Sequence, residues 1–173
     1  MMKRFVVITL FPEMFEPVLG SSMMWKAQKD QKAEFQLINL RDYGLGPRRQ
    51  VDDKPFGGGV GMLLMIQPLT KAIEQARQIL PRAKVLLMTP AKTVWDQKRA
   101  QLHAKNDDDY IIVCGRYEGF DARVEGLVDE KISVGRYVLT GGELPAMIVI
   151  DSIVRLLPGV LGGGDGAADS ALY

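Results

Sequence analysis

The sequence is poor in the residue types that many enzyme classes require. Its 173 residues include one cysteine, Cys114, and one histidine, His103. A single thiol excludes an intrachain disulfide and a cysteine-rich zinc site, and it fits a cytoplasmic location, which we expect. The single histidine stands in a lysine-rich segment that is typical of a solvated helix. A Ser-His-Asp hydrolase and a histidine-ligated metal centre are therefore poor interpretations.

Long apolar runs and a strong net charge are also missing. No segment approaches the roughly 20 apolar residues of a membrane-spanning helix. The apolar run from Phe5 to Phe11 stops at Pro12 and Glu13, without the cleavage site of a signal peptide. The net charge is +1, so binding to nucleic acid would need a local basic patch. With 47% hydrophobic and 25% charged residues, the composition is that of one soluble globular domain.

Short apolar runs rich in branched residues predict buried strands. These runs are 4–11, 35–40, 84–89 and 110–114. Helical patterns lie between and after them: from Pro12, from Ser21 or Ser22 to about Asp30, from Pro68 to Leu80, from a Thr93 cap to about Asn106, and from Leu144 to Leu157. Strands that alternate with helices predict an α/β domain with a mainly parallel sheet.

Glycine-rich turns are the main candidates for a binding site. The first, 52–62, lacks the Gly-Lys-Ser/Thr ending of a P-loop and the order of a Rossmann turn, so a purely structural turn competes with a functional one. The second, 114–121, directly follows a predicted strand, where ligands of open α/β sheets bind. It offers Arg116 and Glu118, which alternatively form a surface ion pair. The third, 134–143, sets main-chain groups beside apolar side chains that suit an adenine ring. Together the turns predict a pocket for a nucleoside-like ligand.

An ordered set of segments resembles a known family. The segments are 9–15 (TLFPEMF), 51–59 (VDDKPFGGG), 114–119 (CGRYEG), 137–146 (YVLTGGELPA), Asp151-Ser152 with Arg155, and 158–162 (PGVLG). In this order and spacing they resemble the bacterial tRNA (guanine-N1)-methyltransferases of the TrmD type, in the SPOUT superfamily. The resemblance implies a mainly parallel α/β sheet flanked by helices, with a deep C-terminal trefoil knot. It makes 1–161 a methyltransferase domain that binds S-adenosylmethionine (SAM), and 162–173 the start of a flexible glycine-rich linker. Under this resemblance, we expect the chain to lack the family's C-terminal tRNA-binding domain.

The resemblance also implies a reaction and its residues. A methyl group passes from SAM to N1 of guanosine at tRNA position 37, in a homodimer whose subunits share the active site. Asp169 would be the general base, and Arg155 would stabilise charge on the guanine or hold a phosphate. Magnesium would assist the reaction, with no metal site in the protein and no membrane partner. The residues expected to contact the cofactor are Met88, Pro90, Gly115, Tyr117, Glu118, Val134, Gly135, Arg136, Tyr137, Val138, Leu139, Gly141, Gly142 and Pro145.

Departures from the family pattern keep other interpretations open. Arg136 stands where the family has Asp, and this charge reversal should weaken binding of a sulfonium unless Arg136 points to solvent or pairs with Glu118. Ala122 replaces an acid, and 47–50 and 91–93 also differ from the family. Without the second domain, we expect weak tRNA binding. One alternative is a knotted SAM-binding dimer that has lost or reduced methyl transfer and acts as a binding or regulatory module. An unrelated nucleotide-binding α/β protein is another.

Overall fold

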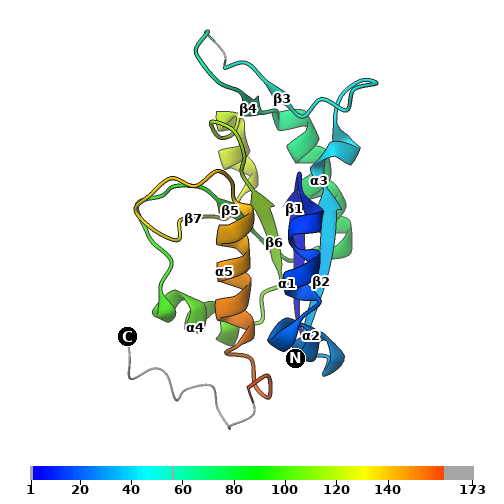
Figure 1. The fold of residues 1–173 in the computed structure, drawn as a ribbon, viewed down its shortest axis with the longest axis vertical. Coiled ribbons are helices and arrows are strands. Elements are labelled where there is room, and N and C mark those ends of the chain that lie inside the picture. The colour runs from blue at the N-terminus through cyan, green and yellow to red at the C-terminus, as the bar shows by residue number, and fades with distance from the viewer. Residues whose placement is uncertain (1, 56, 162–173) are drawn as a thin grey trace.

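A parallel sheet of short, buried strands organises the computed structural model, which describes residues 2–55 and 57–161. The strand order is β2-β1-β6-β5-β7, and every neighbouring pair is parallel. The bounds are β1 Lys3–Thr9, β2 Ala33–Asn39, β5 Lys84–Met88, β6 Tyr110–Cys114 and β7 Glu130–Ile132. This arrangement confirms the predicted mainly parallel α/β class (Figure 1).

Alternate residues of β1 serve two different cores. Phe5 and Val7 join a cluster with residues of α1 (Glu16–Leu19), α2 (Ser22–Lys29), α4 (Gln97–Lys105) and α5 (Glu143–Val154). Val6 and Ile8 join a second cluster with α3 (Ile66–Ile79) on the other face. Successive side chains of a strand point to opposite faces, so a strand covered by helices on both sides is apolar throughout. The sheet is therefore the middle of three layers.

Short elements at the carboxyl ends of the strands complete the chain. The hairpin of β3 (Asp52–Asp53) and β4 (Leu63–Leu64) projects at the end of the molecule opposite α2 and α4 (Figure 1). The 3-10 helices η1 (Pro12–Met14), η2 (Leu40–Tyr43) and η3 (Ala122–Leu127) follow β1, β2 and β6. Within the described residues, no helix is long and apolar enough to span a membrane.

Several local predictions need correction. The cap of α4 is Asp96, whose Oδ1 accepts from Arg99 N at 2.8 Å, and not Thr93. Strand β7 was not predicted, since two of its three residues are charged. His103 is buried, not solvated, because it lies on the inner side of α4 against Trp95 and Tyr110. The knot remains a prediction, and the expected linker, 162–173, lies outside the described residues.

Candidate functional site

A cavity of about 180 Å³ lies at the carboxyl ends of β5, β6 and β7. Three loops line it: 88–90 after β5, 115–120 after β6, and 132–142, which leads from β7 into α5. Thirteen of the fourteen residues predicted to contact the cofactor lie in this lining. The exception is Arg136, an exposed residue outside the lining. The second and third glycine-rich turns thus meet in one pocket, as predicted.

Glycines allow two of these loops to pack backbone to backbone. Gly142 N donates to Gly115 O at 2.7 Å. A Cβ at Gly142 would lie 2.6 Å from Gly115 N and 2.9 Å from Cys114 Cα. A Cβ at Gly115 would lie 2.8 Å from the Phe120 ring. A side chain at Gly142 would require the backbone to move, and one at Gly115 would require the Phe120 ring to move, so the pocket wall depends on both glycines.

The first glycine-rich turn does not line the cavity, but it contacts a residue that does. Glu118 N donates to Met62 O at 3.0 Å, which joins the pocket loop to the β3–β4 hairpin. Gly61 has φ +100°, and a Cβ there would lie 2.2 Å from Glu118 Cγ. Tyr117, beside it, has φ +59°, a left-handed conformation that is uncommon for a residue with a side chain. The hairpin therefore restrains the position of Glu118 at the pocket.

The charged groups of the pocket are paired differently from the sequence expectation. Arg116 Nε donates to Glu143 Oε2 at 3.0 Å, and these two residues are 27 positions apart in the chain. Arg116 therefore pairs with Glu143 and not with Glu118, two positions away. Burial raises the pKa of the Cys114 thiol well above its ordinary value, and the nearby Glu143 carboxylate raises it further. Cys114 is thus protonated at neutral pH, and a buried neutral thiol does not act as a nucleophile.

Of the two predicted catalytic residues, the structure describes Arg155 only. Arg155 is half-buried at the C-cap of α5, next to the last turn of the helix that begins at the pocket. It lies one, two and three turns along α5 from the exposed residues Asp151, Ile148 and Leu144, on the same helix face. Asp169 lies outside the described residues.

Sequence reasoning missed part of the lining. The contacts expected from the family pattern omit Thr89, Ile132 and Ser133, which lie outside the two glycine-rich turns, and also Arg116, Gly119, Phe120 and Thr140, which lie within them. Thr89 directly follows β5, so the strand-end rule could have found it, whereas Ser133 follows β7, a strand that the sequence did not predict. Phe120 lies in the second glycine-rich turn, but the packing of its ring against Gly115 depends on the tertiary structure and could not be predicted.

Comparisons with known proteins identify the family of the chain. The model of the family "tRNA (Guanine-1)-methyltransferase TrmD" matches residues 2–172. A tRNA (guanine-N(1)-)-methyltransferase of Bacillus subtilis is 49% identical over 157 residues, which are 90% of this chain and 64% of that protein. One of Desulfitobacterium hafniense is 46% identical over 159 residues, 92% and 60% of the two chains. The chain therefore spans less than two thirds of the length of these relatives.

A solved structure resembles the whole fold. The crystal structure of tRNA (m1G37) methyltransferase from Aquifex aeolicus superposes with a TM-score of 0.85 at 38% identity. It covers 94% of this chain, and this chain covers 73% of it. Sequence, fold and pocket lead to one assignment: the chain belongs to the TrmD family of tRNA (guanine-N1)-methyltransferases.

Proposed function

We propose that the chain binds SAM in the pocket and transfers its methyl group to N1 of guanosine at position 37 of tRNA. The observation that carries this proposal is the pocket itself. Two glycine turns that are separate in the sequence form one wall at the carboxyl edge of the sheet. These turns, the residues after β5 and Pro145 together include thirteen of the fourteen residues expected to contact the cofactor. Membership of a methyltransferase family supports SAM as the methyl donor.

The lining suits the chemical parts of SAM. Apolar Ile132, Val134 and Leu139 offer an environment for the adenine ring, and the neighbouring main chain offers hydrogen-bonding groups for its edge. Glu118 supplies a carboxylate at the same cavity, which complements a positively charged ligand. When bound, SAM supplies a methyl group made electrophilic by the cationic sulfur. The chain's own task is to hold nitrogen, methyl carbon and sulfur in line.

Proton removal completes the reaction. N1 of guanine carries a proton at neutral pH, so the new N–C bond forms as a base takes that proton, while the C–S electron pair stays on sulfur. We assign the base to Asp169 and the stabilisation of charge on the guanine to Arg155, both from the family pattern. Assistance by magnesium is part of this proposal as well.

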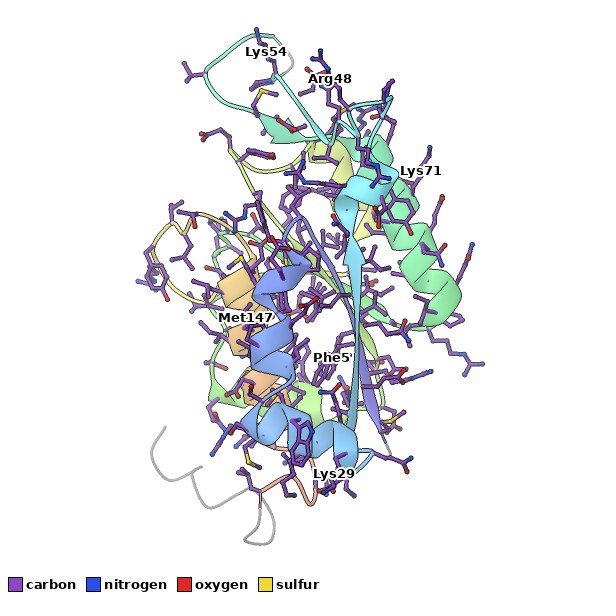
Figure 2. All side chains as sticks on the ribbon, turned by 45° about the vertical axis from the view of Figure 1, so that its right-hand side comes forward. Phe5, Lys29, Arg48, Lys54, Lys71 and Met147 are labelled. Carbon is purple, nitrogen blue, oxygen red and sulfur yellow. The ribbon has the colours of Figure 1, made fainter. Side chains whose placement is uncertain are left out.

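We also propose a homodimer, which the surface of α5 supports. Leu144 and Ile148 are 53% and 48% exposed, and Val18 of the neighbouring α1 is 42% exposed. Figures 1 and 2 show α1 beside α5, with Met147 between them in the second view. Exposed apolar side chains gathered on neighbouring helices are typical of a protein contact. Because Arg155 belongs to the same stripe, a partner seated there would lie next to the proposed catalytic group.

The tRNA would approach from the hairpin end. Figure 2 shows Arg48 and Lys54 at the end from which the β3–β4 hairpin projects, beyond the carboxyl edge of the sheet. Their positive charges suit phosphate contacts there. A cytoplasmic location accompanies this substrate in our proposal. The alternative of a module without methyl transfer was based on Arg136 and on the missing second domain. Arg136 is exposed and lies outside the lining, which argues against the first of these two reasons.

Titration calorimetry with SAM, combined with a methylation assay, tests the proposal. We expect SAM to bind, and we expect methyl incorporation into a tRNA transcript with G37 but not into the same transcript with A37. Light scattering in the same buffer measures the mass of the chain in solution. A folded chain that gives no heat with millimolar SAM would overturn the proposal. SAM binding without methylation would retain the pocket assignment and reject the assigned reaction for this chain.

A further inference from the structure

Glu143 is a buried carboxylate at the first turn of α5, directly after the pocket glycines. Its side chain is 1% exposed. In the described part of the chain, it is the only acidic residue in the buried core. An ionised group in such a place costs several kcal/mol in desolvation unless it is paired and hydrogen-bonded. The residues that satisfy it therefore indicate why it is there.

The carboxylate of Glu143 joins three segments. Oε1 accepts from Thr9 Oγ1 at 2.9 Å, at the end of β1, and Oε2 accepts from Arg116 Nε at 3.0 Å, in the loop after β6. Thr9 Oγ1 in turn accepts from Phe11 N at 3.0 Å. Each carboxylate oxygen thus has a donor from a different segment, and Glu143 itself begins α5.

Arg116 extends these contacts along the cavity. Its guanidinium carbon lies 4.5 Å from the centre of the Phe11 ring, and its Nη1 lies 3.4 Å from Thr140 O. The backbones of Arg116 and Gly141 form an antiparallel bridge. A Cβ at Gly141 would lie 2.4 Å from Arg116 Nε and 2.5 Å from Glu143 Oε2. Glycine at this position therefore leaves the space that the ion pair occupies.

A buried ion pair adds little net stability compared with apolar residues of the same size, but it fixes geometry. We propose that the Glu143–Arg116 pair is a positioning device that sets the spacing of the 115–120 and 138–142 loops and thereby the affinity for SAM. This inference rests on the proposed function of the pocket. Glu143 is a positioning residue, since it acts through Arg116 and the two loops.

Glu143→Gln tests the pair with little change in volume. The amide oxygen still accepts from Thr9, but the amide NH2 group faces the Nε–H of Arg116, so a donor opposes a donor. We expect the dissociation constant for SAM to rise about 10- to 100-fold, the range seen when supporting groups behind a binding site are removed. The melting temperature should fall as well, because the Arg116 guanidinium loses its anionic partner, so affinity is measured at a temperature at which circular dichroism shows the variant to be folded.

Arg116→Lys is the second variant. It keeps the positive charge beside Glu143, so the carboxylate stays compensated, but it loses the planar group that contacts Glu143 and Thr140 at once. SAM affinity should fall here too. In steady-state methylation assays, the KM for SAM should rise by a larger factor than kcat falls. A general loss of folded protein would lower the number of active molecules and leave KM unchanged.

The control is Asp121→Asn. Asp121 pairs with Arg123 at 2.6 Å on the same stretch of chain, but outside the cavity lining. This variant should bind SAM as the original protein does. If the original protein binds SAM and both pocket variants keep its affinity and KM, the positioning role is wrong. If the original protein itself ignores SAM, the proposed function fails instead. Should Glu143→Gln unfold, Arg116→Lys decides the question by the same criterion.

Discussion

The amino ends and the carboxyl ends of the strands form two sides of the sheet, the amino edge and the carboxyl edge, and these are built in opposite ways. At the amino edge, charged groups hold the strand ends together: Lys3 Nζ donates to Asn106 O at 2.6 Å, and Asp109 accepts from Arg4. Lys84 and Asp108 form another ion pair there, at 2.7 Å. At the carboxyl edge, glycine-rich loops surround a cavity. One edge joins strands through side chains, whereas the other leaves space between them.

This difference separates stability from binding. The amino edge satisfies its polar groups internally, so changes there should act on the free energy of unfolding and leave the pocket unaffected. The carboxyl edge relies on close backbone contacts that only glycine permits, so small changes there should affect the ligand first. Substitutions at the two edges should therefore have separable effects.

The largest effect is expected from Gly142→Ala. The added methyl group would meet Gly115 N and Cys114 Cα at contact distances that the backbone must relieve. Overpacking of this kind costs about 1–3 kcal/mol, and we expect SAM affinity to fall at least 30-fold, on the order of 2 kcal/mol. Calorimetry measures the loss. Gly126→Ala is the control, because a Cβ there meets nothing within 4 Å. Equal SAM affinity in the two variants would contradict the role assigned to Gly142.

Asp109→Ala should break the opposite edge alone. Asp109 accepts from Arg4 N at 2.9 Å, Nε at 3.0 Å and Nη2 at 2.6 Å, with 18% of its side chain exposed. Loss of these bonds should cost about 2 kcal/mol of unfolding free energy, measured by urea denaturation. The affinity of the folded protein for SAM should remain within twofold. A parallel fall in affinity would show that the edges are coupled.

The stability of the region around the amino edge of the sheet should also depend on pH, through His103. Burial lowers the pKa of His103, with Arg99, Lys84 and Lys3 acting in the same direction, while a hydrogen bond to the Arg99 carbonyl opposes them. The unfolded chain then takes up a proton near its ordinary pKa of about 6.5 before the folded chain does. The contribution of His103 to stability is therefore present above pH 6.5 or so and is lost as pH falls below it.

His103→Asn removes this titration. Urea midpoints of the variant should vary less than those of the original protein between about pH 5 and 7, with a slope difference of at most about 1.4 kcal/mol per pH unit. The Glu130 carboxylate lies 3.2 Å from His103 Nε2 and favours the protonated ring. An NMR titration that placed the His103 pKa above that of free histidine would show that Glu130 outweighs burial, and would contradict the prediction.

The smallest effect is expected from Arg136→Asp, which restores the family's usual charge. Since Arg136 is exposed and lies outside the pocket lining, solvent and salt screen its charge from a bound ligand. SAM affinity should change by less than about threefold at physiological salt. A tenfold or larger gain would show that Arg136 turns toward the ligand when SAM is bound.

The sequence predicted the elements whose signals are local. Continuous apolar runs located β1, β5 and β6, because strands buried on both faces are largely apolar. The edge strand β2 was located from a run that polar residues interrupt, and most of its residues are only partly buried. Capping could not be settled in the same way: Thr93 and Asp96 both have suitable side chains, and only the backbone decides which oxygen reaches an amide. Tryptophan is a residue type that is highly buried on average, yet Trp25 is 51% exposed on the outer side of α2.

The pocket was predictable where a glycine turn follows a strand, and where the family pattern applies. The pairing of its charges was not. Arg116 and Glu118 stand two positions apart and suggest a local pair, yet Arg116 bonds to Glu143 across the cavity wall. This contact depends on how β6 and α5 pack, which is a property of the tertiary structure and leaves no periodic or composition signal.

The position of β1 between β2 and β6 has a consequence for how the chain folds. Phe5 pairs with Phe35 on one side and with Tyr110 on the other. During synthesis β2 emerges soon after β1, but β6 emerges more than a hundred residues after β1. At about 5–20 residues per second, β1 waits roughly 5–20 s with one apolar edge unpaired. Such non-local pairing slows folding and exposes a strand edge that other chains can bind. A chaperone that shields the first strand should therefore raise the yield of folded protein more than one that acts after release.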